Sequence, residues 1–289
     1  MRWENQRQSD NVEDRRGGGS RGGGLGGRSL GLGSIVIALL ASWIFGINPM
    51  TVLGLLDGAG VQAPISAPSG QKPPANDRMA AFVSTVLADT EDVWTAQFRL
   101  MGKTYAKPTL VLFSGRTPTA CGAGEAAMGP FYCPGDQQVY IDLSFYDTLQ
   151  KRLGAPGDFA QAYVIAHEVG HHVQHLLGVS DKVDRMRRQV SQVQGNALSV
   201  KLELQADCLA GVWAHHAQAA RQVLEAGDIE EAMNAASRIG DDALQQQAGG
   251  TVRPDSFTHG SSAQRVRWFR KGLEQGQMAG CNTFDNKAL

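Results

Sequence analysis

The sequence predicts a helix-dominant α+β fold. Apolar residues recur at helical spacing over residues 159–177, and residues 197–219 are rich in helix formers and contain no proline. Two short runs, residues 109–113 and 139–143, have the β-branched and aromatic composition of strands. About 210 residues follow residue 77, which is enough chain for one domain with a substantial core.

Taken in order, the first 77 residues are expected to lie outside this domain. Residues 1–28 are predicted to be a disordered, basic, Gly-rich cytoplasmic arm, 29–56 a transmembrane signal anchor and 57–77 a flexible linker. The domain itself is predicted to cover residues 78–289. Its helices are expected near residues 78–95, 159–177, 197–219, 229–236 and 263–274.

The predicted anchor contains no charged side chain between residues 29 and 56. Its most apolar part, residues 30–47, would span roughly 27 Å at about 1.5 Å per residue, close to a hydrocarbon core of about 30 Å. A cleaved signal peptide is the alternative, but both the charged leader and the apolar run are long for one. We therefore expect one membrane crossing, and membrane lipid as a partner of this single-pass helix.

The charges on either side of the anchor predict its orientation. Four arginines lie between residues 15 and 28, whereas the first charges after the anchor are Asp57 and Lys72. This asymmetry predicts a cytoplasmic N terminus and a main domain outside the cytoplasm. Basic Gly-rich arms can also bind nucleic acid, but the position beside a membrane span favours anionic lipid, so no nucleic-acid partner is expected.

The four cysteines, Cys121, Cys133, Cys208 and Cys281, all follow the predicted anchor. Four cysteines allow three disulfide connectivities. Glycines and Pro130 favour a locally closed loop between Cys121 and Cys133, which leaves Cys208 to pair with Cys281. Four free thiols in a reducing compartment are the alternative, and zinc binding by cysteine is disfavoured because no CxxC pair exists.

The segment His167-Glu168-Val169-Gly170-His171 indicates chemistry most directly. Because residues i and i+4 share one face of a helix, His167 and His171 can both bind one Zn²⁺ at roughly 2.0 to 2.1 Å. Glu168 could take a proton from a zinc-bound water, whose pKa the metal lowers to about 7, and pass it to a leaving amine. The segment predicts a zinc hydrolase, and chance occurrence is the alternative.

A catalytic zinc needs a third protein ligand, and Glu203 is the candidate. It lies on the predicted helix of residues 197–219, one turn before Asp207, which could accept a hydrogen bond from the free ring N–H of a ligand histidine. The sixth residue after His171 is Leu177 and not histidine, so a His, His, Glu site is favoured over three histidines. A solvated helix carboxylate is the alternative for Glu203.

Residues 167–171 together with Glu203-Leu204-Gln205-Ala206-Asp207 resemble the gluzincin arrangement, and the wider sequence resembles the YpfJ-type neutral zinc metallopeptidases of bacteria. The resemblance covers almost the whole chain. It is carried most closely by residues 1–4, 9–16, 129–134, 140–143 and 258–260. It implies a zincin-like peptidase tethered to a bacterial inner membrane, with a periplasmic or extracellular catalytic domain, zinc as cofactor and a peptide or protein as substrate.

His259 and Arg265 lie six positions apart, a spacing that resembles the late His-to-Arg element of the CAAX-prenyl and heat-shock membrane endopeptidases. In those relatives the element lies at the catalytic cleft, although Gly260 stands here where they have proline. A cation or N–H donor aimed at the oxyanion could contribute about 3 to 4 kcal/mol to lowering the barrier. Either residue is a candidate, and the alternative is that Arg265 is a solvated side chain in the first turn of a helix.

Residues 137–146 alternate enough apolar and polar side chains to predict a strand. Peptidases of this kind hold an extended peptide against an edge strand, so Tyr140 or Tyr132 could contact substrate, unless the strand is internal and its aromatics are core. The sequence therefore predicts a membrane-anchored zinc peptidase with Glu168 as general base. The alternative is a zinc-stabilised membrane scaffold or adaptor without activity, and the oligomeric state is not indicated.

Overall fold

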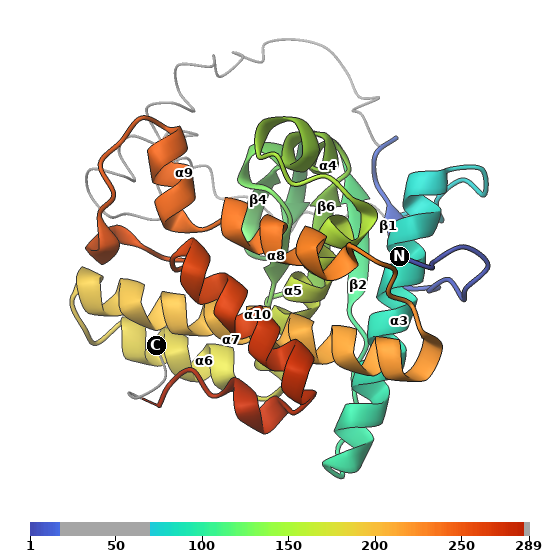
Figure 1. Cartoon of the computed structure of the whole chain (residues 1–289). Helices are drawn as coiled ribbons and strands as arrows, with labels where there is room; N and C mark the ends of the chain where they lie inside the picture. The colour runs from blue at the N-terminus through green and yellow to red at the C-terminus, as the bar shows by residue number, and fades with distance from the viewer. Residues whose placement is uncertain (18–69, 286–289) are drawn as a thin grey trace.

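The computed structural model describes residues 1–17 and 70–285, in which helices pack against a four-stranded sheet of order β1-β2-β6-β5 (Figure 1). The first three strands of that order are parallel, and β5 runs antiparallel to β6. The strands of the sheet are β1 (Val12–Asp14), β2 (Thr109–Phe113), β6 (Gln138–Asp142) and β5 (Phe131–Cys133), and a separate hairpin is formed by β3 (Arg116–Thr119) and β4 (Gly122–Glu125).

The described helices include all five that the sequence predicts and several that it does not. The predicted ones are α3 (Arg78–Leu100), α5 (Asp158–Leu176), α7 (Gln192–Arg221), α8 (Asp228–Arg238) and α10 (Ser262–Gln275). The others are α4 (Ser144–Asp147), α6 (Val179–Arg187), α9 (Asp241–Gln247) and the single turns η1 (Ala126–Met128), η2 (Thr148–Arg152), η3 (Pro254–Ser256) and η4 (Met278–Cys281).

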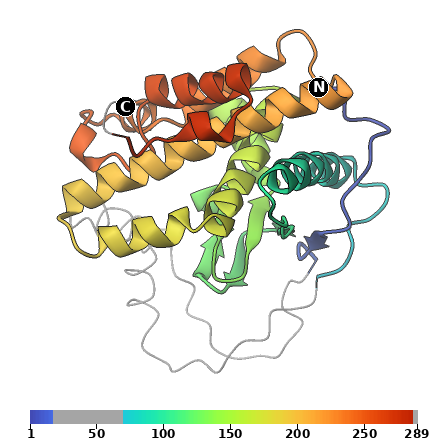
Figure 2. The same cartoon turned by 90° about the horizontal axis from the view of Figure 1, so that it is seen from below.

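The two faces of the sheet belong to two cores. The period-2 alternation of β2 and β6 directs Leu110, Leu112 and their neighbours on β6 into the main core, which α3 and α5 share. Val111 and Phe113 point to a smaller core on the other face. Helix α5 lies between the sheet and the layer of α7, α8 and α10 (Figures 1 and 2), so most of its surface is buried.

Helices α5 and α7 cross at close range because Gly170 has no side chain. A Cβ added to Gly170 would lie 3.1 Å from the carbonyl oxygen of Ala206 and 3.2 Å from its Cα. Both of these are backbone atoms of α7, so they cannot move aside as a flexible side chain would. Gly170 therefore determines where α5 and α7 cross.

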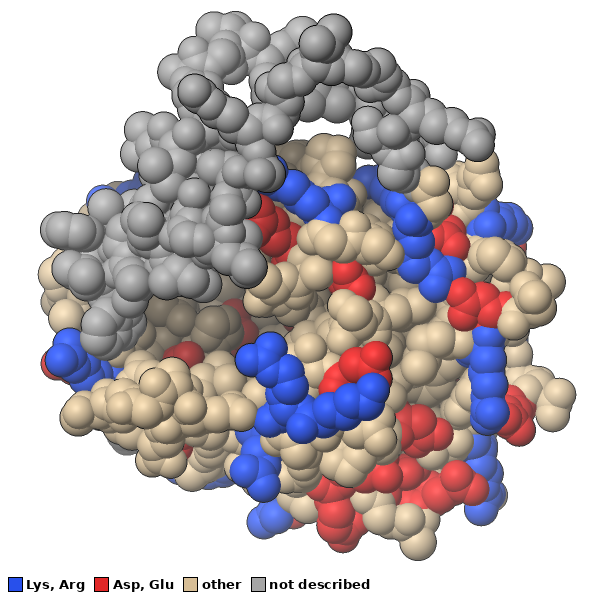
Figure 3. Space-filling model, turned by 90° about the horizontal axis from the view of Figure 1, so that it is seen from above, with Lys and Arg blue, Asp and Glu red and all other residues tan. Residues whose placement is uncertain are grey.

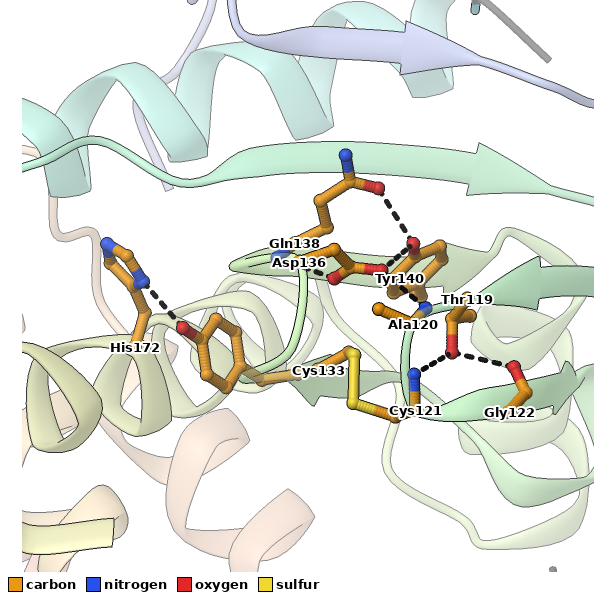
Figure 4. Close-up of a disulfide and its surroundings, with 10 residues drawn as sticks. Thr119, Ala120, Cys121, Gly122, Cys133, Asp136, Gln138, Tyr140 and His172 are labelled. Atoms are coloured by element: carbon orange, nitrogen blue, oxygen red, sulfur yellow. Dashed lines mark hydrogen bonds between the residues drawn. A yellow bond between two sulfur atoms is a disulfide. The ribbon is translucent and has the colours of Figure 1, made fainter. Parts of the chain in front are cut away.

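Both predicted disulfides are present. Cys121–Cys133 ties the turn of the β3–β4 hairpin to β5, and Asp136 accepts a hydrogen bond from the backbone of Ala120 beside it (Figure 4). Cys208–Cys281 ties α7 to η4 near the C-terminal end of the described chain. No cysteine is left free.

The first 17 residues belong to the folded unit, contrary to the prediction of a disordered arm over residues 1–28. Strand β1 pairs with β2, with Val12 opposite Leu110. The amino group of Met1 lies 2.6 Å from Asp158 and 3.3 Å from Asp228. These contacts involve elements far along the chain, so local composition could not reveal them.

The predicted fold class is wrong in its N-terminal transmembrane helix. Within the described ranges, no helix is both long and apolar enough to cross a membrane. The predicted anchor, residues 29–56, lies outside the described residues, as does most of the predicted linker.

The predicted localisation is contradicted as well, for a topological reason. Residues 1–17 and 70–285 fold together as one unit, so both must lie on the same side of any membrane. A cytoplasmic N terminus with the main domain on the opposite side is incompatible with this pairing. The predicted role of membrane lipid as a partner loses its support with it.

Candidate metal centre

Three predicted ligands come together between α5 and α7. Nε2 of His167 lies 3.1 Å from one carboxylate oxygen of Glu203, and Nε2 of His171 lies 3.4 Å from the other. The potential ligand atoms of the three residues all lie within 4.8 Å of one another. This group can therefore hold a single metal ion.

The helix crossing explains why these side chains meet. His167 and His171 are one turn apart on α5, and Gly170 between them is the contact point with Ala206 of α7. Glu203 precedes Ala206 by three residues, so it lies one turn along α7 from the crossing and on the side of the two imidazoles. Because Gly170 permits the crossing, it also brings the Glu203 carboxylate within reach of the two imidazoles.

Asp207, the predicted hydrogen-bond partner of a ligand, is completely buried beside His167. Its Oδ1 accepts from Nδ1 of His167 at 2.8 Å and also from the hydroxyl of Tyr163. Burial acts to raise the pKa of Asp207, but the charges of Arg265 and His167 outweigh it and lower the pKa to about 2. The ionised carboxylate holds the proton on Nδ1, so the Nε2 lone pair of His167 faces Glu203.

Arg265 is 2% exposed, so it is not a solvated helix residue. Its Nε and one terminal nitrogen each donate to Asp207 at 2.9 Å, and the other terminal nitrogen donates to the carbonyl of Ile239 at 3.2 Å. These contacts commit the guanidinium to Asp207 and favour a positioning role over direct contact with an oxyanion.

Glu168, the predicted general base, follows His167 and lines the same cleft. Its side chain makes no hydrogen bond to another described residue. Burial raises its pKa, although the two neighbouring imidazoles oppose this shift. A carboxylate with a raised pKa beside a metal centre is suited to take up and release a proton near neutral pH.

His259 lies on the loop between η3 and α10 and also lines the cleft. Its Nδ1 is 3.2 Å from Asp241, whose other carboxylate oxygen accepts the backbone N–H groups of Thr258, His259 and Gly260 at 2.7 to 3.0 Å. Asp241 therefore holds both the loop and the ring. Sequence reasoning missed Asp241 because its partners lie on a distant loop, and the only local signal was its place after Gly240 at a helix start.

The cleft has a volume of about 1050 Å³, with His167, Glu168 and Glu203 in its wall. Residues 126–132 line another part of it, and Ile239 and Leu244 line a third. On the face seen in Figure 3, acidic and basic side chains are interspersed and do not form a field of one sign. The cleft is large enough for several residues of an extended peptide.

The predicted substrate strand occupies a different place from the one expected. Strand β6 pairs with β2 on one side and β5 on the other, so it is internal. Tyr140 of β6 stacks on Phe131 in the smaller core. Strand β5 is the edge strand, and its Tyr132 lines the cleft and contacts His172 of α5 at 3.0 Å.

A second acidic cluster, Asp158, Asp228 and Glu231, also places its carboxylates within 4.8 Å of one another. The amino group of Met1 already lies against two of these residues, Asp158 and Asp228. The cluster has no histidine, and its carboxylates already contact the positively charged amino group of Met1. The His, His, Glu group is therefore the favoured metal site.

Two imidazoles and a carboxylate converging in a cleft of a helix-rich α+β fold are typical of zinc-dependent hydrolases. Residues 1–284 match the family described as "Putative neutral zinc metallopeptidase", and the chain belongs to this family. It is 54% identical to the uncharacterized protein YpfJ of Escherichia coli K12, over 98% of this chain and 99% of that one. It is also 44% identical to the uncharacterized protein Rv2575 of Mycobacterium tuberculosis H37Rv, over 62% and 63% of the two chains. No solved structure matches the chain.

Proposed function

We propose that this protein is a zinc-dependent peptidase that hydrolyses peptide bonds with Glu168 as general base. The observation that carries the proposal is the convergence of His167, His171 and Glu203 within 4.8 Å, in the same cleft as Glu168. Membership of the family supports the same reading.

The donor set fits zinc. Two neutral imidazole nitrogens and one carboxylate make up the protein ligands of many catalytic zinc sites, which leave a fourth position open. The only described hydrogen-bonding partners of the Glu203 carboxylate are His167 and His171, and a cation between the three groups would neutralise its partly buried charge. Zinc, when bound here, would polarise a scissile carbonyl and lower the pKa of a water to about 7.

The residues of the chain then have separate tasks in peptide hydrolysis. Glu168 takes the proton of the attacking water and delivers it to the leaving amine. His259, held by Asp241, can donate a hydrogen bond to the oxyanion that develops on the carbonyl oxygen. Asp207 and Arg265 keep His167 in place.

The substrate is expected to lie along β5. Residues 129–132 line the cleft, and β5 is the edge of its sheet, with no other described strand paired to its outer side. An extended peptide could add to this edge through main-chain hydrogen bonds, with Tyr132 beside it. This arrangement favours peptide or protein substrates over small molecules.

Substitution of Glu168 by Gln tests the proposal on the full chain, since residues 1–17 are part of the fold. Glu168→Gln is expected to bind zinc like the wild type, by elemental analysis, and to lose peptide cleavage by about 10²- to 10⁴-fold in a peptide-library digest. Glu203→Gln is expected to lose zinc itself. Unchanged cleavage by Glu168→Gln would exclude Glu168 as the base. Zinc binding by a wild type that cleaves no peptide would instead favour a zinc-stabilised scaffold or adaptor.

A further inference from the structure

His171 is supported by neutral amides, in contrast to the carboxylate behind His167. Its Nδ1 lies 2.9 Å from Oε1 of Gln174, which is completely buried one turn later on α5. The amide nitrogen of Gln174 donates to the carbonyl of Leu202 at 2.7 Å and to the side-chain oxygen of Gln205 at 3.1 Å. The amide nitrogen of Gln205 in turn donates to the carbonyl of Cys281 at 3.0 Å.

The two backbone carbonyls determine the direction of every hydrogen bond in this series. A carbonyl oxygen can only accept, so the Gln174 atom that faces Leu202 must be its NH₂ group. The other amide atom of Gln174, which faces His171, is then the oxygen, and it can only accept. Nδ1 of His171 must therefore carry a proton, which leaves the Nε2 lone pair directed towards Glu203.

The same argument applies at Gln205, whose NH₂ group must face the carbonyl of Cys281. The series of donors thus runs in one direction, from His171 through Gln174 and Gln205 to Cys281, and aligned hydrogen bonds of this kind strengthen one another. Cys281 is buried and bonded to Cys208 of α7. The disulfide consequently holds the last acceptor of the series against the helix that carries Glu203.

We propose that Gln174 and Gln205 are positioning residues that fix the tautomer of His171, and that the Cys208–Cys281 disulfide anchors them, so that zinc affinity depends on this disulfide. The proposal rests on the metal site of the proposed function and adds a determinant of its affinity. Removal of the disulfide loosens Cys281 and then the Gln205 amide, which is one of the two acceptors of the Gln174 NH₂ group; the carbonyl of Leu202 remains the other. The His167 side of the site, held by Asp207 and Arg265, does not share this dependence.

Zinc affinity, measured by competition with a chromophoric chelator, tests the proposal without any peptidase assay. Gln174→Met is expected to weaken zinc binding by about 10- to 100-fold, the usual effect of removing a hydrogen-bond partner of a metal ligand. The matched control is Gln161→Met, on the same helix and without a hydrogen bond from its side chain to another described residue. It is expected to bind zinc like the wild type.

The disulfides provide a second matched pair. Cys208→Ser with Cys281→Ser is expected to weaken zinc binding, whereas Cys121→Ser with Cys133→Ser, which removes a disulfide unconnected to the ligands, is not. Gln205→Met interrupts the series without touching either disulfide, and should weaken binding as well. Because Gln205 and the disulfide act in one series, their combined variant should lose no more affinity than the more severe of the two alone.

A spectroscopic readout separates positioning from general loss of structure. In the zinc-loaded wild type, the Nδ1–H of His171 should give a ring ¹H–¹⁵N signal that exchanges slowly with water, and Gln174→Met should lose it. Wild-type affinity and signal in folded Gln174→Met, or equal zinc affinity in the two disulfide variants, would overturn the proposal. If the wild type itself binds no zinc, the proposed function fails. This result can be distinguished from the two outcomes above, because in both of them the wild type does bind zinc.

Discussion

Arg265 and Asp207 form a two-pronged ion pair in which both side chains are buried and both hydrogen bonds measure 2.9 Å. The pair joins α10 to α7 directly behind His167. Arg265 lies 58 positions after Asp207 in the sequence, and it holds the carboxylate that accepts from Nδ1 of His167, a candidate metal ligand. If either residue of the ion pair were removed, the other would remain as a buried charge without an oppositely charged partner.

Replacing Arg265 by Met should therefore destabilise the protein strongly. The change leaves the Asp207 carboxylate buried with no full positive charge beside it, at a cost of about 3 to 5 kcal/mol in the free energy of unfolding. Urea denaturation of the metal-free protein measures it. The control is Arg267→Met on the exposed face of α10, which should change the stability little. Equal stabilities for the two variants would contradict the role of the ion pair.

Gly170→Ala should separate α5 from α7. The new methyl group meets backbone atoms of Ala206 at 3.1 to 3.2 Å, so the helices must move apart, at a cost of about 1 to 3 kcal/mol. Because this crossing brings Glu203 to the imidazoles, zinc affinity should fall together with thermal stability. Gly195→Ala on α7 meets nothing within 4 Å and should be neutral or stabilising. Normal zinc affinity in Gly170→Ala would show that the crossing does not control the site.

His259→Ala should lower kcat and change KM little, because the proposed hydrogen bond forms to charge that develops only in the transition state. The expected loss is about 10²- to 10³-fold in kcat. Asp241→Asn, which weakens the hold on the His259 ring and loop, should shift kcat in the same direction by less. His216→Ala, away from the cleft, serves as control. A variant that changed only KM would assign His259 to substrate binding.

Glu91 should make stability depend on pH. Burial acts to raise its pKa, but hydrogen bonds from Ser9, Asn11 and Lys107 outweigh it, so the folded pKa lies below the usual 4.5. The carboxylate therefore stabilises the protein fully above about pH 5 and loses this effect as the pH falls through the folded pKa. Glu91→Gln should cost about 1 to 3 kcal/mol at pH 7.

Urea denaturation between pH 7 and pH 3 measures this dependence. The free energy of unfolding of the wild type should fall more steeply below pH 5 than that of Glu91→Gln. Parallel curves would indicate that Glu91 has the same pKa in the folded and unfolded chains.

The helices and the convergence of His167, His171 and Glu203 could be predicted because their signals are local. Residues 159–177 carry apolar residues at helical spacing, and Glu203 and Asp207 are one turn apart on a helix that the composition favours. Strand β1 could not be predicted, because Val12 is the one apolar residue in Val12-Glu13-Asp14 and its partner β2 lies far along the chain. Its position in the sheet depends on tertiary pairing alone.

The outer contacts of the site escaped prediction for a similar reason. Gln174 and Gln205 are ordinary residues of helices in the sequence, and only the crossing of α5 and α7 brings their amides together. Arg265 was correctly placed near the cleft by its spacing from His259, but the burial that pairs it with Asp207 depends on how α10 packs on α7. The spacing of residues in the sequence indicates which of them share one face of a helix, but it does not indicate which other element packs on that face.

Strand β1 also determines what happens when the first residues of the chain are lost. Without it, strand β2, which is buried from Leu110 to Phe113, would present its backbone N–H and C=O groups and the apolar run Leu110-Val111-Leu112 at an open sheet edge. Open edges of this kind recruit strands from other molecules. A chain that lacks residues 1–16 should therefore self-associate on refolding, and the polar segment at the start of the sequence acts as a built-in protection against aggregation.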